Sequence, residues 1–119
     1  ANTDGNYPYG TSSKGPYLQQ TTRVGSYSEN GFGLFDMHGN VWEWCQDLYG
    51  ENVYESRSGT TTNPLSGGVG VHRVLRGGSW NDFSWYARSA YRFRCTPDER
   101  IYDDGFRVVS AAGIRTRAP

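Results

Sequence analysis

The sequence is poor in long hydrophobic runs, in cysteine and in histidine. No stretch of about 18 consecutive apolar residues occurs, so we expect no membrane span, and the N-terminus lacks the charged and apolar regions of a signal peptide. Two cysteines, Cys45 and Cys95, and two histidines, His38 and His72, are not spaced as in a zinc site, which argues against a structural zinc. The sequence leaves open whether the cysteines form a disulfide, because it does not give their separation.

An excess of charge of one sign is also missing. The 12 Lys and Arg residues balance the 12 Asp and Glu residues, so no overall field would draw the chain to nucleic acid, and we expect no nucleic-acid partner. A length of 119 residues fits one compact domain. The 16 glycines and the 15% aromatic content favour frequent turns and a core built from flat rings.

The first two thirds of the chain alternate between irregular segments and one clear strand pattern. Residues 1–31 are rich in Gly, Ser, Thr, Asn, Tyr and Pro and show no periodicity, which predicts loop or disorder. The alternation at residues 41–44 (VWEW) predicts a strand after the turn-prone Gly39-Asn40, with both indoles on its buried face. Residues 49–70 return to a polar, turn-rich composition and predict a long surface excursion.

The last third holds shorter patterns. A second apolar run at residues 73–80 contains Gly77-Gly78, a pair that lets the backbone turn or pack closely. Residues 87–94 predict a strand or a short helical turn, and residues 105–109 predict a final strand. The remaining residues have the composition of a tail.

Four ordered motifs connect these segments to a known family. GLFDMHGNVWEW, RVLRGGSW, RSAYRFR and GFRVV follow one another over about 75 residues, and together they resemble the formylglycine-generating-enzyme/sulfatase-modifying-factor family. The resemblance implies a C-type-lectin-like α+β fold, in which much irregular chain surrounds a small twisted sheet. Only the C-terminal half of the family pattern is present. We therefore expect residues 1–119 to be the C-terminal part of one domain, whose N-terminal half is a separate or cleaved chain acting as a partner. The alternative is a reduced version of the domain.

The catalytic members of the family bind copper through two cysteines spaced C-x4-C after the GGS motif. An alignment anchored on RFRC at Cys95 puts Trp85 and Ala90 at those positions, and neither side chain binds copper. Cys95 corresponds to a cysteine that relatives use structurally. We therefore predict a non-enzyme that binds no copper. The alternative is a formylglycine-generating-enzyme-like copper oxidase acting on protein cysteine.

A non-catalytic branch of the family offers another function. In the variable proteins of diversity-generating retroelements, segments between fixed motifs are rewritten at adenines to vary a binding surface, and residues 81–104 here occupy the matching place. The candidate ligand-binding residues are Asn81, Asp82, Phe83, Tyr86, Tyr91, Phe93, Arg94, Thr96, Ile101, Tyr102 and Asp103. Each of them, and Cys95 with them, can be encoded by an AAC codon altered only at its adenines.

The composition of this set also suits binding, because Tyr and Phe give large contact areas at a small entropic cost and Asn, Asp and Thr give adaptable hydrogen bonds. The resemblance implies a protein or glycan ligand and a cell-surface or extracellular location. The competing interpretation is an unspecified binding or structural paralogue, in which these are ordinary surface residues and Phe83 is part of the core.

The resemblance also implies a structural Ca²⁺ at the GNVWEW loop, held by the side chains of Asn40 and Glu43 and the carbonyl of Val41. The alternative is that Asn40 is only a left-handed turn residue and that Glu43 pairs with an arginine. We expect four arginines to brace irregular backbone through carbonyls and carboxylates. They are Arg76, Arg88, Arg92 and Arg107.

Overall fold

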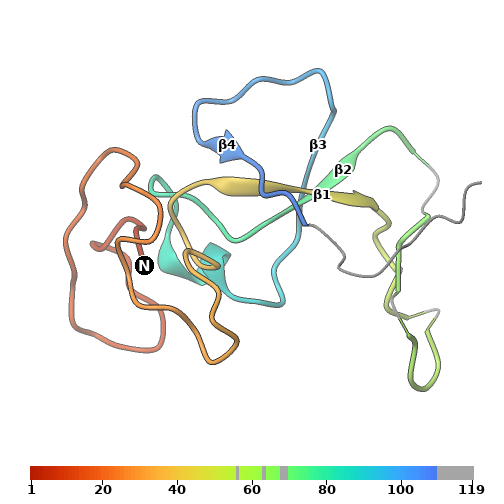
Figure 1. Cartoon of the computed structure of the whole chain (residues 1–119), viewed down its shortest axis with the longest axis horizontal. Helices are drawn as coiled ribbons and strands as arrows, with labels where there is room; N and C mark the ends of the chain where they lie inside the picture. The colour runs from red at the N-terminus through yellow and green to blue at the C-terminus, as the bar shows by residue number, and fades with distance from the viewer. Residues whose placement is uncertain (56, 63, 68–69, 110–119) are drawn as a thin grey trace, which may run out of the picture.

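A computed structural model describes residues 1–55, 57–62, 64–67 and 70–109. It contains one four-stranded sheet with the strand order β3-β2-β1-β4 and one 3-10 helix (Figure 1). The elements are β1 (Trp42–Leu48), β2 (Arg73–Arg76), η1 (Ser84–Ala87), β3 (Phe93–Cys95) and β4 (Asp104–Gly105). The pairs β1-β2 and β2-β3 are antiparallel, and β1-β4 is parallel. No helix within the described residues is long and apolar enough to cross a membrane.

The strand predicted at residues 41–44 is confirmed, and it extends further than predicted. Asn40 has φ of 75° and Gly39 has φ of 82°, so the left-handed turn expected at this pair ends just before β1 begins at Trp42. The strand then continues to Leu48 with a register shift after Trp44. A shift of this kind bends the strand and strengthens its twist.

The sheet has two chemically different faces. Trp42, Leu75 and Cys95 form a buried cluster, and Trp44 packs against it. We call this side the tryptophan face. Because side chains alternate along a strand, Val74 and Arg76 point to the other side, where they line a pocket with Cys45. We call this second side the arginine face. Cys45 and Cys95 therefore lie on opposite faces, and both are free thiols.

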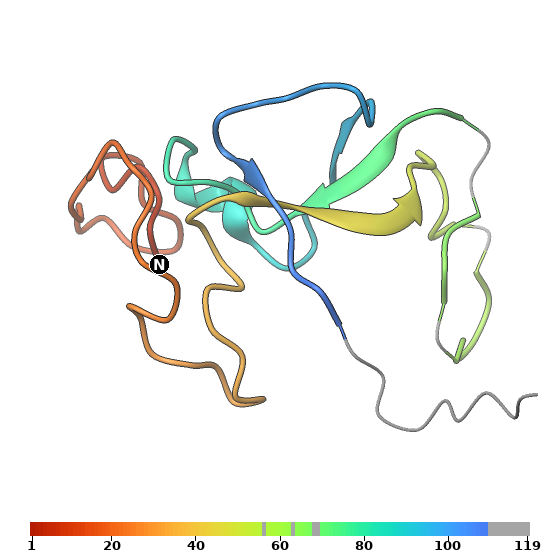
Figure 2. The same ribbon diagram turned by 45° about the horizontal axis from the view of Figure 1, so that its top comes forward.

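Two long connections cover the tryptophan face. The connection from β2 to β3 contains η1, and its Tyr86 and Tyr91 pack against the buried cluster. The connection from β3 to β4 must pass from one edge of the sheet to the other (Figure 2). Its Pro97 and Ile101 line a hollow with Trp44. The topology thus brings two separate stretches of the sequence to one side of the sheet.

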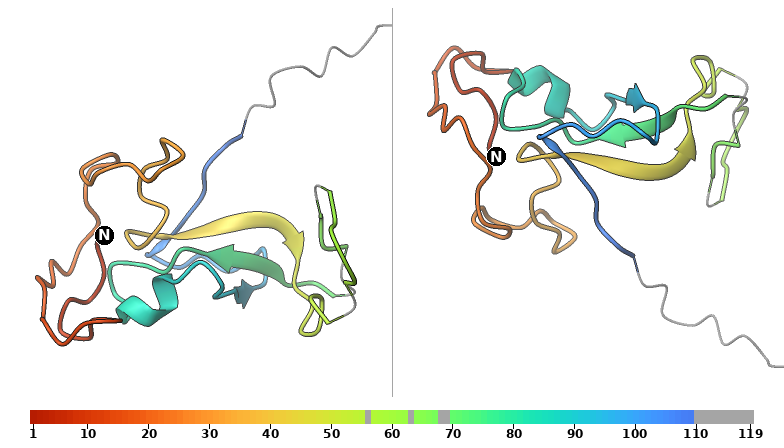
Figure 3. Two further views of the ribbon diagram at one scale, coloured as in Figure 1. Left: turned by 90° about the horizontal axis from the view of Figure 1, so that it is seen from below. Right: turned by 90° about the horizontal axis from the view of Figure 1, so that it is seen from above.

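The N-terminal segment and the excursion lie at opposite ends of the sheet (Figure 3). Residues 1–31 are an ordered loop: Asn2 forms a β-bridge with Gly39, and Asp4 forms one with Phe83. At the other end, the excursion after β1 returns where the Leu48 amide donates to the Ser66 carbonyl at 3.0 Å. The N-terminal loop therefore extends the surface around η1, and the excursion covers part of the arginine face.

Two predicted elements differ from the structure. Residues 87–94 are divided between the end of η1 and the start of β3, so both a helical turn and a strand occur there. The strand predicted at residues 105–109 is wrong beyond Gly105, because β4 pairs only with the first two residues of β1. Val108 and Val109 are 86% and 87% exposed. The predicted tail, residues 110–119, lies outside the described residues.

Candidate functional site

The junction after β2 positions the first of the two connections. Gly78 has φ of 71°, and a Cβ there would lie 3.0 Å from the backbone nitrogen of Ala87. A side chain at this position would therefore collide with η1 in a backbone conformation that L-residues rarely adopt. The glycine pair in the GGSW motif lets η1 pack directly on the chain that leaves β2.

Ser79 joins the two connections. It is fully buried, and its hydroxyl lies 2.7 Å from Oδ2 of Asp82 and 2.6 Å from Oδ2 of Asp103. The Asp103 carbonyl also accepts a hydrogen bond from the Trp42 amide at 2.8 Å. One serine thus ties the start of the first connection to the end of the second, beside the first residue of β1.

Four of the predicted binding residues form a continuous series of rings. The ring centroids of Phe83 and Tyr86 lie 6.3 Å apart, and those of Tyr86 and Tyr91 lie 5.0 Å apart in an edge-to-face arrangement. Trp42 then lies 5.9 Å from Tyr91 and 5.4 Å from Phe93. Aromatic pairs at these separations attract one another beyond their burial. Phe83 and Phe93 are each about two fifths exposed, so the series reaches the surface at both ends.

The two connections also meet through polar groups. Nδ2 of Asn81 donates to the Tyr102 hydroxyl at 2.9 Å, and the Tyr17 hydroxyl donates to Oδ1 of Asn81 at 2.6 Å. The ring of Tyr102 lies 5.8 Å from that of Trp80. Tyr102 is 71% exposed, and Ile101 beside it is 39% exposed. These side chains present both polar and apolar surface to solvent.

The remaining predicted residues lie elsewhere. The carboxylates of Asp82 and Asp103 contact Ser79; Asp103 is buried and Asp82 is partly buried. Arg94 pairs with Val74 on the arginine face, where its guanidinium lies 5.1 Å from the ring centroid of Tyr49. The Thr96 carbonyl accepts the Glu99 amide in a tight turn. Contact of these four residues with a ligand stays a prediction.

Two residues of this surface were missed from the sequence. Tyr7 lies 4.1 Å from the ring of Phe83, and Tyr17 contacts both Asn81 and Trp80. Both come from the N-terminal segment, whose only signal was an enrichment in tyrosine. Burial, followed by the neighbouring Tyr86, raises the pKa of the Tyr91 phenol. Tyr91 therefore stays a neutral hydrogen-bonding group at physiological pH.

The two positions where the family's copper enzymes carry cysteine have other uses here. The ring of Trp85 stacks on Tyr86 at 4.0 Å, and the Arg88 guanidinium lies 5.0 Å from its centroid. Ala90 is exposed. Burial and a hydrogen bond to Glu99 raise the pKa of the Cys95 thiol to about 12. Cys95 is therefore a protonated thiol at neutral pH, which is a poor metal ligand.

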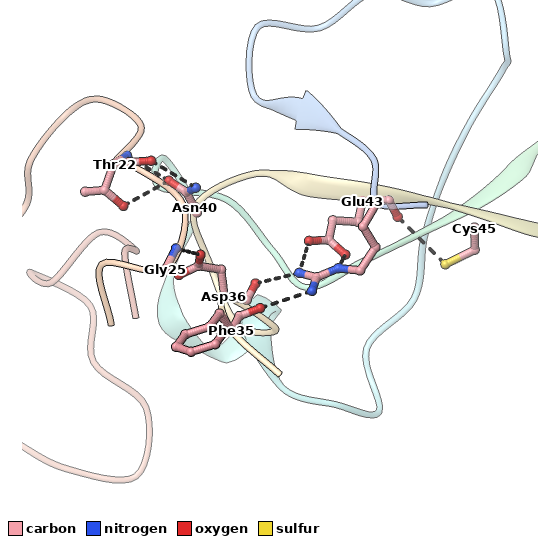
Figure 4. A network of polar contacts seen from close by, with 8 residues as sticks. Thr22, Gly25, Phe35, Asp36, Asn40, Glu43 and Cys45 are labelled. Atoms are coloured by element: carbon pink, nitrogen blue, oxygen red, sulfur yellow. Dashed lines mark hydrogen bonds and ion pairs between the residues drawn. The ribbon is translucent and has the colours of Figure 1, made fainter. Parts of the chain in front are cut away.

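The side-chain oxygens expected to hold Ca²⁺, those of Asn40 and Glu43, are engaged by protein groups (Figure 4). Oδ1 of Asn40 accepts the Thr22 amide at 2.8 Å and the Asn2 side chain at 3.3 Å. Both carboxylate oxygens of Glu43 accept hydrogen bonds from the Arg107 guanidinium. This arrangement does not fit a Ca²⁺ ion, which would have to displace Arg107 and the amides first. Ca²⁺ binding stays a prediction of the resemblance.

The expected bracing role holds for three of the four arginines. Arg76 donates to the carbonyls of Ser89 and Tyr91, and Arg92 donates to that of Glu51. Arg107 donates to the carbonyls of residues 35 and 36 as well as to Glu43. Arg88 instead stacks on aromatic rings.

A small twisted sheet with long irregular connections over one face is a C-type-lectin-like α+β fold, as the resemblance implied. The structure is similar to that of Treponema denticola variable protein 1, with a TM-score of 0.59 and 32% identity over 85% of this chain and 34% of that chain. The chain belongs to the family described as the sulfatase-modifying factor enzyme 1-like domain, whose model matches residues 1–112.

Two curated relatives show the range of this family. The chain is 44% identical over 93 residues to the serine/threonine-protein kinase pkn1 of Chlamydia pneumoniae, which is 78% of this chain and 15% of that protein. It is 37% identical over 113 residues to the formylglycine-generating enzyme of Streptomyces coelicolor, which is 92% of this chain and 35% of that protein. The chain thus spans about a sixth to a third of these relatives.

Proposed function

We propose that the chain is a non-catalytic ligand-binding module of the variable-protein type. Its binding surface is made by the two connections over the tryptophan face, at residues 81–93 and 101–102. The single observation that carries this proposal is that separate candidate stretches meet there, linked by the hydrogen bond between Asn81 and Tyr102. A ligand lying across both stretches would contact Phe83, Phe93, Ile101 and Tyr102, which are 39% to 71% exposed.

The chemistry of this surface supports a protein or glycan ligand. Exposed rings can cover apolar patches or the flat faces of sugars, and the Asn81 amide and the tyrosine hydroxyls supply directional hydrogen bonds. The rings are held by neighbouring rings and the backbone by Ser79, so little freedom is lost on binding. The likeness to Treponema denticola variable protein 1 favours the same use of the fold.

We also propose that the module catalyses no reaction. Trp85 and Ala90 occupy the positions of the copper-binding cysteines, and the two cysteines of the chain lie on opposite faces of the sheet. A competition titration with a Cu(I) chelator tests this directly. We expect no Cu(I) transfer from the chelator to the protein. Stoichiometric transfer would favour the copper-oxidase alternative.

Binding itself can be tested on glycan arrays and protein microarrays. We expect a reproducible ligand whose binding weakens at least about tenfold in Phe83→Ala and in Tyr102→Ala, one variant in each connection. Phe32→Ala is the matched control, since Phe32 is an aromatic residue that is 89% exposed and lies outside the surface. Equal losses in all three variants, or no ligand on either array, would contradict the proposal.

A further inference from the structure

A second pocket lies on the arginine face, on the opposite side of the sheet from the proposed binding surface. It has a volume of about 290 Å³ and lies between the strands β1 and β2 and the excursion that follows β1. Figure 1 shows the excursion at the end of the sheet away from the N-terminal loop. Three arginines line the pocket: Arg57 from the excursion, Arg76 from β2 and Arg92 from just before β3.

The three guanidiniums are held in place by rings and carbonyls. Arg92 lies between Tyr49 and Tyr54, with 5.0 Å and 4.6 Å from its guanidinium carbon to their centroids. Arg57 lies 5.6 Å from the centroid of Tyr54, whose hydroxyl accepts a hydrogen bond from Arg76 at 2.7 Å. Stacking uses the flat face of a guanidinium and leaves N–H groups at its edge available in Arg57 and Arg92. Arg76 uses three of its five N–H groups on the carbonyls of Ser89 and Tyr91 and on the Tyr54 hydroxyl, which leaves two for the pocket. The pocket therefore holds oriented donors.

The positive charge of this pocket is largely uncompensated. Asp47 is the one acidic residue among the lining residues, against the three arginines. Oδ1 of Asp47 accepts the Ser66 amide at 2.7 Å. Within the described part of the chain, the ion pair found is that of Arg107 with Glu43, and neither residue lines this pocket. A pocket with this balance of charge favours an anion.

Ser66 gives an independent indication of a ligand. It lines the pocket and is 7% exposed, and its hydroxyl has no hydrogen-bond partner among the described residues. Its backbone is fixed by the Asp47 carboxylate and the Leu48 amide. A buried hydroxyl without a partner destabilises a fold, and an oxygen acceptor in the pocket would satisfy it once the Ser66 side chain turned toward the pocket.

We propose that this pocket binds a phosphate or sulfate group, with Arg57, Arg76 and Arg92 donating to its oxygens and the Ser66 hydroxyl completing the set. Three forked cations approaching from separate segments suit an oxyanion with several oxygens. The volume is at the small end of ligand pockets, and it leaves room for a small sugar or similar group attached to the oxyanion. The site is separate from the proposed binding surface, so either proposal can be refuted without refuting the other.

The site can be tested by isothermal titration with inorganic phosphate, inorganic sulfate, glucose 6-phosphate and glucose. We expect saturable binding of the three anions and no binding of glucose. Tighter binding of glucose 6-phosphate than of phosphate would assign the group to a larger ligand, and equal binding would assign it to the free ion. The absence of saturable binding by all three anions, or binding of glucose alone, would overturn the proposal.

Variants separate this site from general charge effects. Within the described residues, the Arg57 guanidinium stacks on Tyr54 and accounts for no hydrogen bond or ion pair, so the fold should persist in Arg57→Gln. We expect the anion affinity of this variant to fall about tenfold or more. Ser66→Ala should weaken binding severalfold without lowering the stability of the free protein. Arg23→Gln is the control, because it removes the same charge from an exposed position outside the pocket. An equal loss in Arg23→Gln would contradict a specific site.

Discussion

The Ser79 hydroxyl lies 2.6 Å from the Asp103 carboxylate, across 24 residues of sequence and entirely inside the protein. The same hydroxyl contacts Asp82, near the start of the connection from β2 to β3. The two contacts therefore fix the end of the connection from β3 to β4 relative to the start of the other connection. Ser79 of the GGSW motif thus holds two otherwise independent stretches together by side-chain hydrogen bonding. Under the proposed function, residues of the two connections vary while Ser79 and its contacts keep the backbone in place.

Ser79→Ala should therefore lower the stability of the whole chain. The hydroxyl has a single proton to donate, and Asp82 keeps the Ser79 amide at 3.0 Å, so the substitution mainly removes the hydroxyl beside the Asp103 carboxylate, which is 8% exposed. We expect the free energy of unfolding to fall by about 1–3 kcal/mol. Urea unfolding followed by tryptophan fluorescence measures it. Ser89→Ala is the control, since Ser89 is exposed and its contact with Arg76 is through the backbone carbonyl. An equal loss of unfolding free energy in the two variants would refute the structural role of the Ser79 hydroxyl.

Asp104 makes the stability depend on pH. Burial, then Asp103 and Glu99, raise its pKa from 3.8 to about 6, and its buried Oδ2 has no hydrogen-bond partner among the described residues. Because the folded pKa is above the unfolded one, the protonated form stabilises the fold. That contribution is complete below about pH 4 and is lost as the pH rises through about 6.

Asp104→Asn should remove this dependence. We expect the variant to be more stable than the wild type by about 1 kcal/mol at pH 7.5, where partial exposure and solvent screening limit the effect. At pH 4 the difference should disappear. Chemical denaturation at the two pH values measures it, and a variant that is less stable at pH 7.5 would contradict the assignment.

Arg107 holds the segment after β4 against the start of β1. It pairs with both carboxylate oxygens of Glu43 and also donates to the carbonyls of Phe35 and Asp36. The hydrogen bonds to Glu43 raise the pKa of Arg107, so the guanidinium stays charged. We expect a double-mutant cycle of Arg107→Gln and Glu43→Gln to give a coupling of about 1 kcal/mol. A coupling indistinguishable from zero would show that the pair contributes nothing to stability and would contradict this role.

Arg107 occupies the Glu43 carboxylate that the family resemblance assigns to Ca²⁺. If the family's Ca²⁺ site is retained, Arg107→Gln should bind Ca²⁺ severalfold more tightly than the wild type, because Glu43 is released. Thermal unfolding at increasing Ca²⁺ concentration measures this through the rise in Tm. Glu43→Gln should abolish the rise. No rise in Tm in either the wild type or Arg107→Gln would show that the chain has not retained the family's Ca²⁺ site.

The fold could be anticipated from the sequence because its motifs coincide with its constrained positions. The VWEW alternation gave β1 its buried indoles, and Gly78 and Ser79 form the junction that packs η1 and pins the second connection. The strand expected at residues 105–109 failed for a physical reason. Valine propensity predicts a strand, but after Gly105 the chain leaves the edge of β1, and Arg107 donates to the carbonyls of Phe35 and Asp36.

The candidate site was harder to predict than the fold. Sequence alone could not show that Asp103 turns inward and that Arg94 lies on the opposite face, because both depend on which way a short strand or turn presents its side chains. Tyr7 and Tyr17 reach the surface only through long-range bridges of the N-terminal loop. The arginine pocket had no local signal, since its three arginines come from three separate segments.

The central claim is that residues 81–93 and 101–102 form a variable binding surface on a fixed scaffold. Deep sequencing of the encoding locus across a population, scored codon by codon, tests it most directly. We predict substitutions concentrated at adenine-derived positions of codons for residues such as Phe83, Phe93 and Tyr102, with residues 73–80 and 105–109 unchanged. Uniform variation without an adenine bias would contradict the claim and leave a static member of the family.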